Sequence, residues 1–435
     1  MAMQKTRFYR GSILNPLDDK KYDFLKDGVL VVKGEGKKSK IKDLLPLSEA
    51  RKKYGKEMNA ANTTNFGSSL ILPAFYDMHF HWVQDDVREM PKDSLLGWLE
   101  KYTFPTEMKF SDKKYALKRA KEFFRKLSKS GTLGGACYSS IHEHAVEAAM
   151  DHVQGNFVIG NVLMNMNSPE KLTQTEEDSL SLTKRLIKRY GKKHSFTPRF
   201  AITTTPRVMK EGSKMADKAK CFKQTHLSET PQEIDFVLSI YRKLPGFEKV
   251  SSYTEIYEKT GMLGRRSLMG HGIHLSDKEL KVLCKTQTNI IHCPTSNAPL
   301  KEKGLGSGLF DFKKVEKAKV MWALGSDIGG GPFLSMFDVM RSFVDQNKKA
   351  GVKDATYLKA LYRSTLAGAQ IMKHDEWSGN LEVGKDANFI VIPLKKNIAS
   401  AKPEEILRSM IIPHRLKREN YDSLVKSVYY RGKLI

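Results

Sequence analysis

Cysteine is scarce in this chain, and the few cysteines that occur form no close pair. Four of them are spread over 435 residues, which excludes a disulfide framework and a cysteine-based zinc finger. No apolar stretch approaches the roughly 18 residues that a membrane-spanning helix needs, and residues 1–17 contain no apolar segment of signal-peptide length. We therefore expect a cytoplasmic protein with no contact to a membrane.

Acidic residues are also in deficit. Lys and Arg number 74 against 49 Asp and Glu, which leaves a net charge of +25. The basic residues occur in short runs, for example 37–40 and 51–53, and not in one block. The excess therefore favours a generally basic surface over a nucleic-acid-binding face. The apolar fraction of 40% and the charged fraction of 28% are ordinary for a globular protein.

Short apolar runs alternate with helical stretches through the middle of the chain. One such stretch, residues 115–129, has Leu117, Ala120, Phe123, Phe124 and Leu127 at helical spacing, and Ser276 with Glu279 forms a capping-box pattern before another. Eight strands alternating with helices predict a TIM-type (β/α)₈ barrel, of class α/β. The eight runs are 70–76, 133–138, 157–163, 196–200, 221–226, 268–271, 289–292 and 320–324.

Both ends of the chain have β-type patterns. The runs at 8–14 and 28–32 precede the barrel, and those at 388–392 and 425–430 follow it. We expect them to pair into one small β-sandwich domain built from both chain ends. The predicted domains are thus 1–69 and 376–435, which form the β domain, and 70–375, which forms the barrel. The Lys-rich stretch at 34–66 is predicted to form loops or an insertion.

The first barrel strand ends in two histidines, His79 and His81. Side chains alternate along a strand, so both imidazoles face the same side. Two imidazoles on one face can bind one divalent metal. By itself the pair is weak evidence for a metal, because two surface or hydrogen-bonded histidines that bind nothing are the more common case.

Three later strands also end in ligand-competent residues. His226 closes the fifth strand, His271 the sixth and Asp327 the eighth, while Glu229 follows His226 in the next turn. Catalytic groups of a (β/α)₈ barrel lie at the C-terminal ends of its strands. Any one of these residues could be a core histidine or a helix cap, but their shared position predicts one metal site, with Glu229 placed to move protons.

This order of ligands resembles the amidohydrolase superfamily, and longer strings resemble its guanine deaminase family, especially the bacterial-type members. The resemblance runs from about residue 69 to 392 and covers most of the chain. The strings are LLGWLEKYTFPTE at 95–107, TPRFA at 197–201, HGIHLS at 271–276, HCPTSN at 292–297, SDIGGG at 326–331 and GNLEVGK at 379–385.

The resemblance implies a homodimer that binds one Zn²⁺ per chain and acts in purine catabolism or salvage. Hydroxide on the metal would attack C2 of guanine and release xanthine and ammonia. The implied metal ligands are His79, His81, His226 and Asp327. Glu229 would shuttle protons, and His271 together with Asp327 would orient the attacking oxygen. Gln84, Arg199 and Phe200 would hold the purine.

The chemistry of these residues agrees with a guanine-type substrate. The planar donor fork of Arg199 suits the O6 and N7 acceptors of guanine, and the amide of Gln84 can read an N–H beside a carbonyl. Phe200 and Trp98 would form apolar walls, although Trp98 fits core packing equally well.

Three alternatives stay open. The base could be an oxidised purine, a pterin or another aminated heterocycle, with the same chemistry. The metal could be iron, since three imidazoles and a carboxylate suit more than one divalent ion. A non-catalytic barrel that binds nucleic acid is the remote alternative, and only the net charge supports it.

Overall fold

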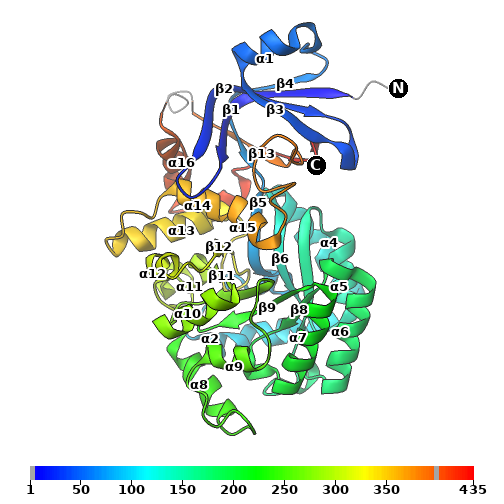
Figure 1. Ribbon diagram of the computed structural model, residues 1–435, viewed down its shortest axis with the longest axis vertical. Helices are drawn as coiled ribbons and strands as arrows, with labels where there is room; N and C mark the ends of the chain where they lie inside the picture. The colour runs from blue at the N-terminus through cyan, green and yellow to red at the C-terminus, as the bar shows by residue number, and fades with distance from the viewer. Residues whose placement is uncertain (1–4, 396–400) are drawn as a thin grey trace.

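Two sheets form the framework of the protein, and the chain builds them from different parts of its length (Figure 1). The computed structural model describes residues 5–395 and 401–435. An eight-stranded sheet runs in sequence order from β5 to β12, and its first and last strands are in contact, so that the sheet curls into a barrel. A seven-stranded sheet, with the order β15-β14-β13-β4-β1-β2-β3, lies beside it and joins both chain ends. This confirms the predicted class.

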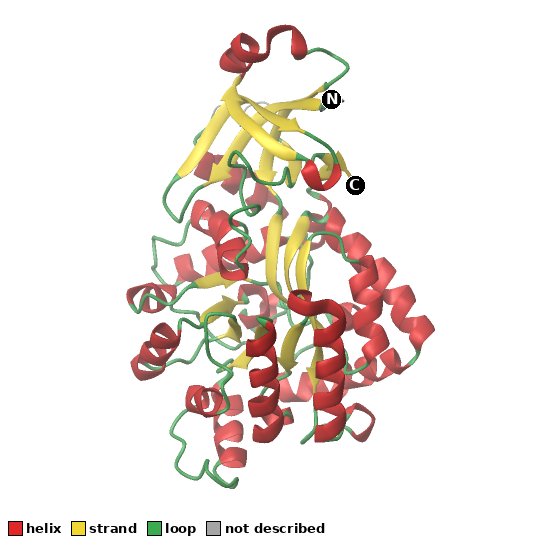
Figure 2. Cartoon of the chain, turned by 45° about the vertical axis from the view of Figure 1, so that its right-hand side comes forward, coloured by secondary structure: helices red, strands yellow, loops and turns green. Residues whose placement is uncertain are grey.

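All neighbouring strands of the barrel are parallel, and helices surround them (Figure 2). Seven of the eight strands fall where the apolar runs predict them. The eight are β5 (Phe75–His81), β6 (Thr132–Ser139), β7 (Asn156–Leu163), β8 (Ser195–Pro198), β9 (Phe222–Leu227), β10 (Ser267–His271), β11 (Asn289–His292) and β12 (Trp322–Leu324).

The prediction for the first barrel strand is wrong in its bounds. The apolar run at 70–76 is divided between two strands, because β4 (Thr63–Pro73) belongs to the seven-stranded sheet and β5 starts only at Phe75. Between them, the Ala74 N–H donates to the carbonyl of Asn388 at 3.0 Å. The run is buried throughout, and its one local signal for this change of sheet is Pro73, which cannot donate a sheet hydrogen bond and ends β4.

The helices provide the outer layer of the barrel and the cover of its mouth. Helix α4 (Lys113–Lys129) confirms the predicted helix, but Leu117 is 49% exposed and does not join its buried face. The capping box of Ser276 and Glu279 is present at α10 (Asp277–Thr286). The others are α1 (Leu47–Tyr54), α2 (Leu95–Trp98), α3 (Phe104–Met108), α5 (Glu143–His152), α6 (Glu176–Tyr190), α7 (Pro206–Ala219), α8 (Pro231–Tyr241), α9 (Tyr253–Lys259), α11 (Pro294–Asn297), α12 (Phe312–Lys317), α13 (Met336–Lys349), α14 (Tyr357–Arg363), α15 (Leu366–Met372) and α16 (Pro403–Ile411).

The seven-stranded sheet is held together across almost the full length of the chain. Its strands are β1 (Thr6–Pro16), β2 (Tyr22–Lys33), β3 (Lys40–Pro46), β4, β13 (Phe389–Pro393), β14 (Ser427–Tyr430) and β15 (Lys433–Leu434). Antiparallel pairing of β13 with β4 joins the C-terminal part to the N-terminal part. The rings of Phe389 and Tyr429 stack at 4.5 Å, and Tyr9 meets both edge-on.

The Lys-rich stretch at 34–66 does not form loops, contrary to the prediction. It contains β3, which pairs with β2, and helix α1. Helix α1 rests on the sheet through Ala50 and through an edge contact of Tyr54 with Phe8. These tertiary contacts stabilise a segment whose composition alone is that of a loop. The predicted domain boundaries stay a prediction.

No helix in the described part of the chain is both long and apolar enough to cross a membrane.

Candidate active site

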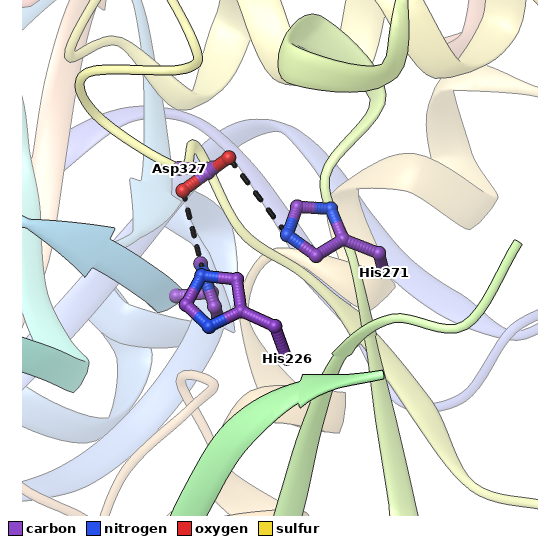
Figure 3. Close-up of side chains that lie close together, drawn as sticks. His226, His271 and Asp327 are labelled. Carbon is purple, nitrogen blue, oxygen red and sulfur yellow. Dashed lines mark ion pairs between the residues drawn. The ribbon is translucent and has the colours of Figure 1, made fainter. Parts of the chain in front are cut away.

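The barrel brings together the four predicted metal ligands and His271 at its C-terminal mouth. Figure 3 shows three of these side chains, His226, His271 and Asp327, close to one another. His79 and His81 lie on β5, His226 on β9 and His271 at the end of β10, while Asp327 follows β12. His271 and Asp327 have φ angles of 70° and 49°, in the left-handed region that non-glycine residues rarely adopt. Strain of this kind concentrates at functional sites.

The distances between these side chains are those of a single cluster. One ligand atom from each of His79, His226, His271 and Asp327 lies within 4.8 Å of all the others. An Asp327 carboxylate oxygen is 3.3 Å from His79 Nε2, and His81 Nε2 is 3.2 Å from His226 Nε2. His81 Nε2 is also 3.6 Å from Asp327. The structure thus brings together the four predicted ligands and His271.

The protonation of the cluster suits a cation. Burial lowers the pKa of all four imidazoles, so they are neutral and have a lone pair to offer. Burial alone would raise the pKa of Asp327, but the close approach of His79 Nε2, at 3.3 Å, and of the other imidazoles holds it well below its usual range. His226 Nδ1 lies 2.6 Å from the carbonyl of Arg199, which can only accept, so Nδ1 carries the proton and Nε2 is free to ligate.

Two imidazole nitrogens at the centre of the cluster have no hydrogen-bond partner. The Nε2 atoms of His79 and His271 are buried and make no hydrogen bond with any described residue. Buried polar groups without partners are rare in proteins and need an explanation. A divalent ion beside His79 Nε2 and Asp327 would supply one for His79, and His271 Nε2 is left to face whatever binds that ion, so the residues present fit a metal.

Glu229 lies next to the cluster without being part of it. Asn297 Nδ2 and Ser307 Oγ donate to its Oε1 at 3.1 and 3.0 Å, and its Oε2 is 3.4 Å from His271 Nε2. Burial raises the pKa of Glu229, the charge of Asp327 raises it further, and the Ser307 hydrogen bond opposes the rise. A carboxyl group with a raised pKa can both accept and donate a proton near neutral pH.

The four residues predicted to hold the substrate line one pocket, and the cluster forms its floor. Gln84, Trp98, Arg199 and Phe200 share this pocket with His81, His226, Glu229 and Asp327. Leu95, Leu99 and Leu305 provide apolar walls. A flat, apolar pocket with a few convergent polar groups is the usual form of a small-molecule site.

A carboxylate that the sequence analysis did not single out organises the far side of this pocket. Glu107, on α3, is fully buried and accepts from Arg199 Nη1 through both oxygens, at 2.8 and 2.7 Å. Gln84 Nε2 donates to the same carboxylate at 2.8 Å. Glu107 bonds only the Nη1 donor of Arg199. The Nε and Nη2 donors of Arg199 make no hydrogen bond with the described residues.

Sequence signals existed for some of the missed residues. Glu107 closes the string at 95–107 and Asn297 closes the string at 292–297, so the family resemblance contained both without giving them a role. Ser307 lies in a segment with no recognisable motif. Only the folded structure shows that it bonds Glu229.

A (β/α)₈ barrel with imidazoles and a carboxylate gathered at its C-terminal mouth has the form of a metal-dependent hydrolase. Residues 70–434 match the model of the family described as "Amidohydrolase family", so the chain belongs to that family. Within it, the chain is similar to guanine deaminases. It is 32% identical to that of Escherichia coli (strain K12) over 85% of this chain and 82% of the relative, and 31% identical to that of Dictyostelium discoideum over 89% and 88%.

A solved structure gives the same result. The guanine deaminase of C. acetobutylicum, described as having guanine bound in its active site, superimposes with a TM-score of 0.84. It is 27% identical in sequence, and the match covers 99% of this chain and 100% of that one.

Proposed function

We propose that this chain is a zinc-dependent guanine deaminase, which hydrolyses guanine to xanthine and ammonia. The observation that carries the proposal is the pocket itself, which Gln84 and Arg199, both bonded to Glu107, share with His81, His226 and Asp327. The similarity to guanine deaminases of two distant organisms supports the choice of substrate.

His79, His81, His226 and Asp327 would hold the zinc, and His271 would lie beside the reacting atoms. A bound divalent ion supplies a water that loses its proton near neutral pH. The unpartnered Nε2 atom of His79 and the Nδ1 hydrogen bond of His226 support this assignment.

Arg199 and Gln84 position the base. The free Nε and Nη2 donors of Arg199 suit the O6 and N7 acceptors of guanine, while Glu107 neutralises the charge of the guanidinium and fixes its plane. Gln84 gives one N–H to Glu107 and accepts from the Gly329 N–H at 3.4 Å. Its carbonyl oxygen has a second lone pair that can accept from a ring N–H. The edge of Phe200, which packs against His226, forms an apolar wall.

Glu229 moves the protons. It accepts a proton from the attacking water as the bond between that oxygen and C2 forms, and it passes this proton to ring nitrogen N3. The second proton of the water goes by the same carboxylate to the exocyclic nitrogen, and the C2–N bond breaks to release ammonia. Asn297 and Ser307 hold Oε1, which leaves Oε2 facing His271 for this transfer.

The proposal includes a cytoplasmic location and a homodimer. The location is supported by four cysteines that are all free thiols, as a reducing compartment requires. The dimer rests on the family resemblance alone, and sedimentation of the purified protein tests it.

The test follows the absorbance of guanine and the release of ammonia by the zinc-loaded protein, with Glu229→Ala as the matched control. We expect xanthine and ammonia in equal amounts from the wild type and neither from the variant. A folded, metal-loaded wild type that leaves guanine unchanged would contradict the assignment of guanine as the substrate. Pterins and oxidised purines, assayed in parallel, then decide which aminated base is accepted.

A further inference from the structure

A second hollow, away from the catalytic pocket, is lined mainly by cations. It measures about 580 Å³ and lies against α13, between residues 301–302 and residues 415–418, which follow α16. Figure 1 shows α13 and α16 on the same side of the molecule. Six of the eight lining side chains are positively charged, namely Lys301, Arg341, Lys348, Lys349, Arg415 and Arg418. We call this the basic hollow.

The carboxylates around the basic hollow do not balance its charge. Glu302 and Asp345 line it, and both Arg341 and Arg418 bond to Asp338 beneath it. Three carboxylates against six cations leave an excess of three positive charges. Lys301 and Lys348 take part in no ion pair within residues 5–395 and 401–435.

Arg341 is the unusual member of this group. Its side chain lines the hollow although the residue is only 5% exposed. Nε and Nη1 are bonded to Asp338 and Asp345, but Nη2 is buried and has no partner among the described residues. A buried guanidinium donor without an acceptor destabilises the protein, so the carboxylates around the hollow do not satisfy Arg341 in full, and its charge adds to the excess of the hollow.

This combination favours one class of ligand. The planar fork of arginine matches phosphate oxygens, and lysines add point charges around them. An excess of three charges in a hollow larger than a single phosphate suits two linked phosphates. Nucleic acid is bound along a continuous basic groove, whereas the basic hollow is local. We propose that the basic hollow binds a small phosphate-bearing anion of the diphosphate class.

The test is calorimetric titration of the full-length protein with inorganic pyrophosphate at low ionic strength, a readout that does not depend on deamination. We expect saturable binding of one anion per chain. The double variant Lys301→Glu/Lys348→Glu should weaken it at least about tenfold, because a hydrogen bond to a charged group contributes that much or more. Both lysines are exposed, so the variant should fold.

The matched control is Lys192→Glu/Lys193→Glu. It changes the net charge equally at two exposed lysines of another surface, and binding should be unchanged. No saturable binding to the wild type, or an equal loss in both double variants, would overturn the proposal. So would tighter binding of a single-stranded oligonucleotide that the Lys301→Glu/Lys348→Glu change abolishes. Uridine diphosphate in a parallel titration tells whether free diphosphate or a nucleotide is the better ligand.

Discussion

The barrel mouth and the seven-stranded sheet both bury polar groups, but the hydrogen bonding of these groups differs. In the sheet, the hydroxyl of Tyr9 is buried among aromatic rings and donates to the carbonyl of Gly432 at 2.6 Å. At the mouth, the Nε2 atoms of His79 and His271 are equally buried and have no partner. An unsatisfied buried group costs about 1–3 kcal/mol. Ser39 Oγ and Asn388 Nδ2, next to strands of the sheet, also lack partners, but the unpartnered atoms of the mouth belong to a cluster whose ligand atoms lie within 4.8 Å of one another, where one ligand can bind them.

The backbone shows the same contrast. Tyr9, Phe389 and Tyr429 lie on regular strands of the sheet. Two residues of the metal cluster, His271 and Asp327, have left-handed backbone conformations where their strands end. Residues held this way persist only when their surroundings force them to. Changes at the mouth should therefore affect activity first, and changes in the sheet should affect stability first.

The largest expected effect is on catalysis, from Glu229→Gln. The amide keeps the shape of the side chain and can still bond Asn297 and Ser307, but it cannot move a proton. We expect kcat/KM for guanine to fall by about 10²–10⁴-fold with no loss of thermal stability, measured by steady-state kinetics and calorimetry. A variant that keeps most of its turnover would remove Glu229 from the mechanism.

The converse variant lies in the sheet. Phe389→Ala removes a fully buried ring that stacks on Tyr429, so the free energy of unfolding should fall by about 3–5 kcal/mol. The kcat/KM of the folded protein should stay at the wild-type value. Denaturant titration and kinetics at low temperature measure the two quantities, with Phe389→Leu as the milder control. A large loss of kcat/KM in the folded variant would contradict the expectation that changes in the sheet affect stability and not activity.

Glu107→Gln tests the polar edge of the pocket, where stability and activity should fall together. Breaking a buried ion pair from one side costs about 3–5 kcal/mol, because the other charge stays buried and uncompensated. We expect KM for guanine to rise, since Arg199 loses its fixed plane, while the metal content stays unchanged. Glu107→Gln combined with Arg199→Gln should recover much of the stability but none of the guanine binding. Equal KM values in the wild type and Glu107→Gln would show that Glu107 is only structural.

The smallest effect concerns a buried histidine outside the site. Burial lowers the pKa of His194 to about 4, so between pH 6.5 and 4 the unfolded chain binds a proton that the folded chain does not. Its contribution to stability is therefore complete above pH 6.5 and is lost as the pH falls, by about 1.4 kcal/mol per pH unit. In His194→Gln the free energy of unfolding should depend less steeply on pH, because unfolding then takes up one proton fewer. Identical pH profiles would contradict this.

The sequence predicted the site better than it predicted the transitions between elements. His79, His81, His226, His271 and Asp327 all stand at strand ends, where a barrel gathers side chains whatever the details of its loops. The junction at 73–75 has one local signal, Pro73, at which β4 ends, but the buried apolar residues on both sides of it predict a single strand. Leu117 fits the spacing of a buried face, but the buried stripe of helix α4 runs through the neighbouring Ala116 and leaves Leu117 49% exposed.

Glu107 and Ser307 show the other limit. Neither lies at a strand end, and both reach the site through contacts between segments that are far apart in the sequence, Glu107 to Arg199 and Ser307 to Glu229. No local periodicity encodes such contacts. A resemblance between strings can include the residue, as it did for Glu107, without saying what it bonds.

The central claim is that the polar atoms left without partners at the barrel mouth form one divalent cation site on which deamination depends. The direct measurement is metal content per chain and guanine turnover in the same samples of wild type and His226→Ala. We predict one zinc ion per wild-type chain, and its loss together with turnover in the variant. Full turnover by metal-free wild type, or zinc retained in full by His226→Ala, would contradict the account.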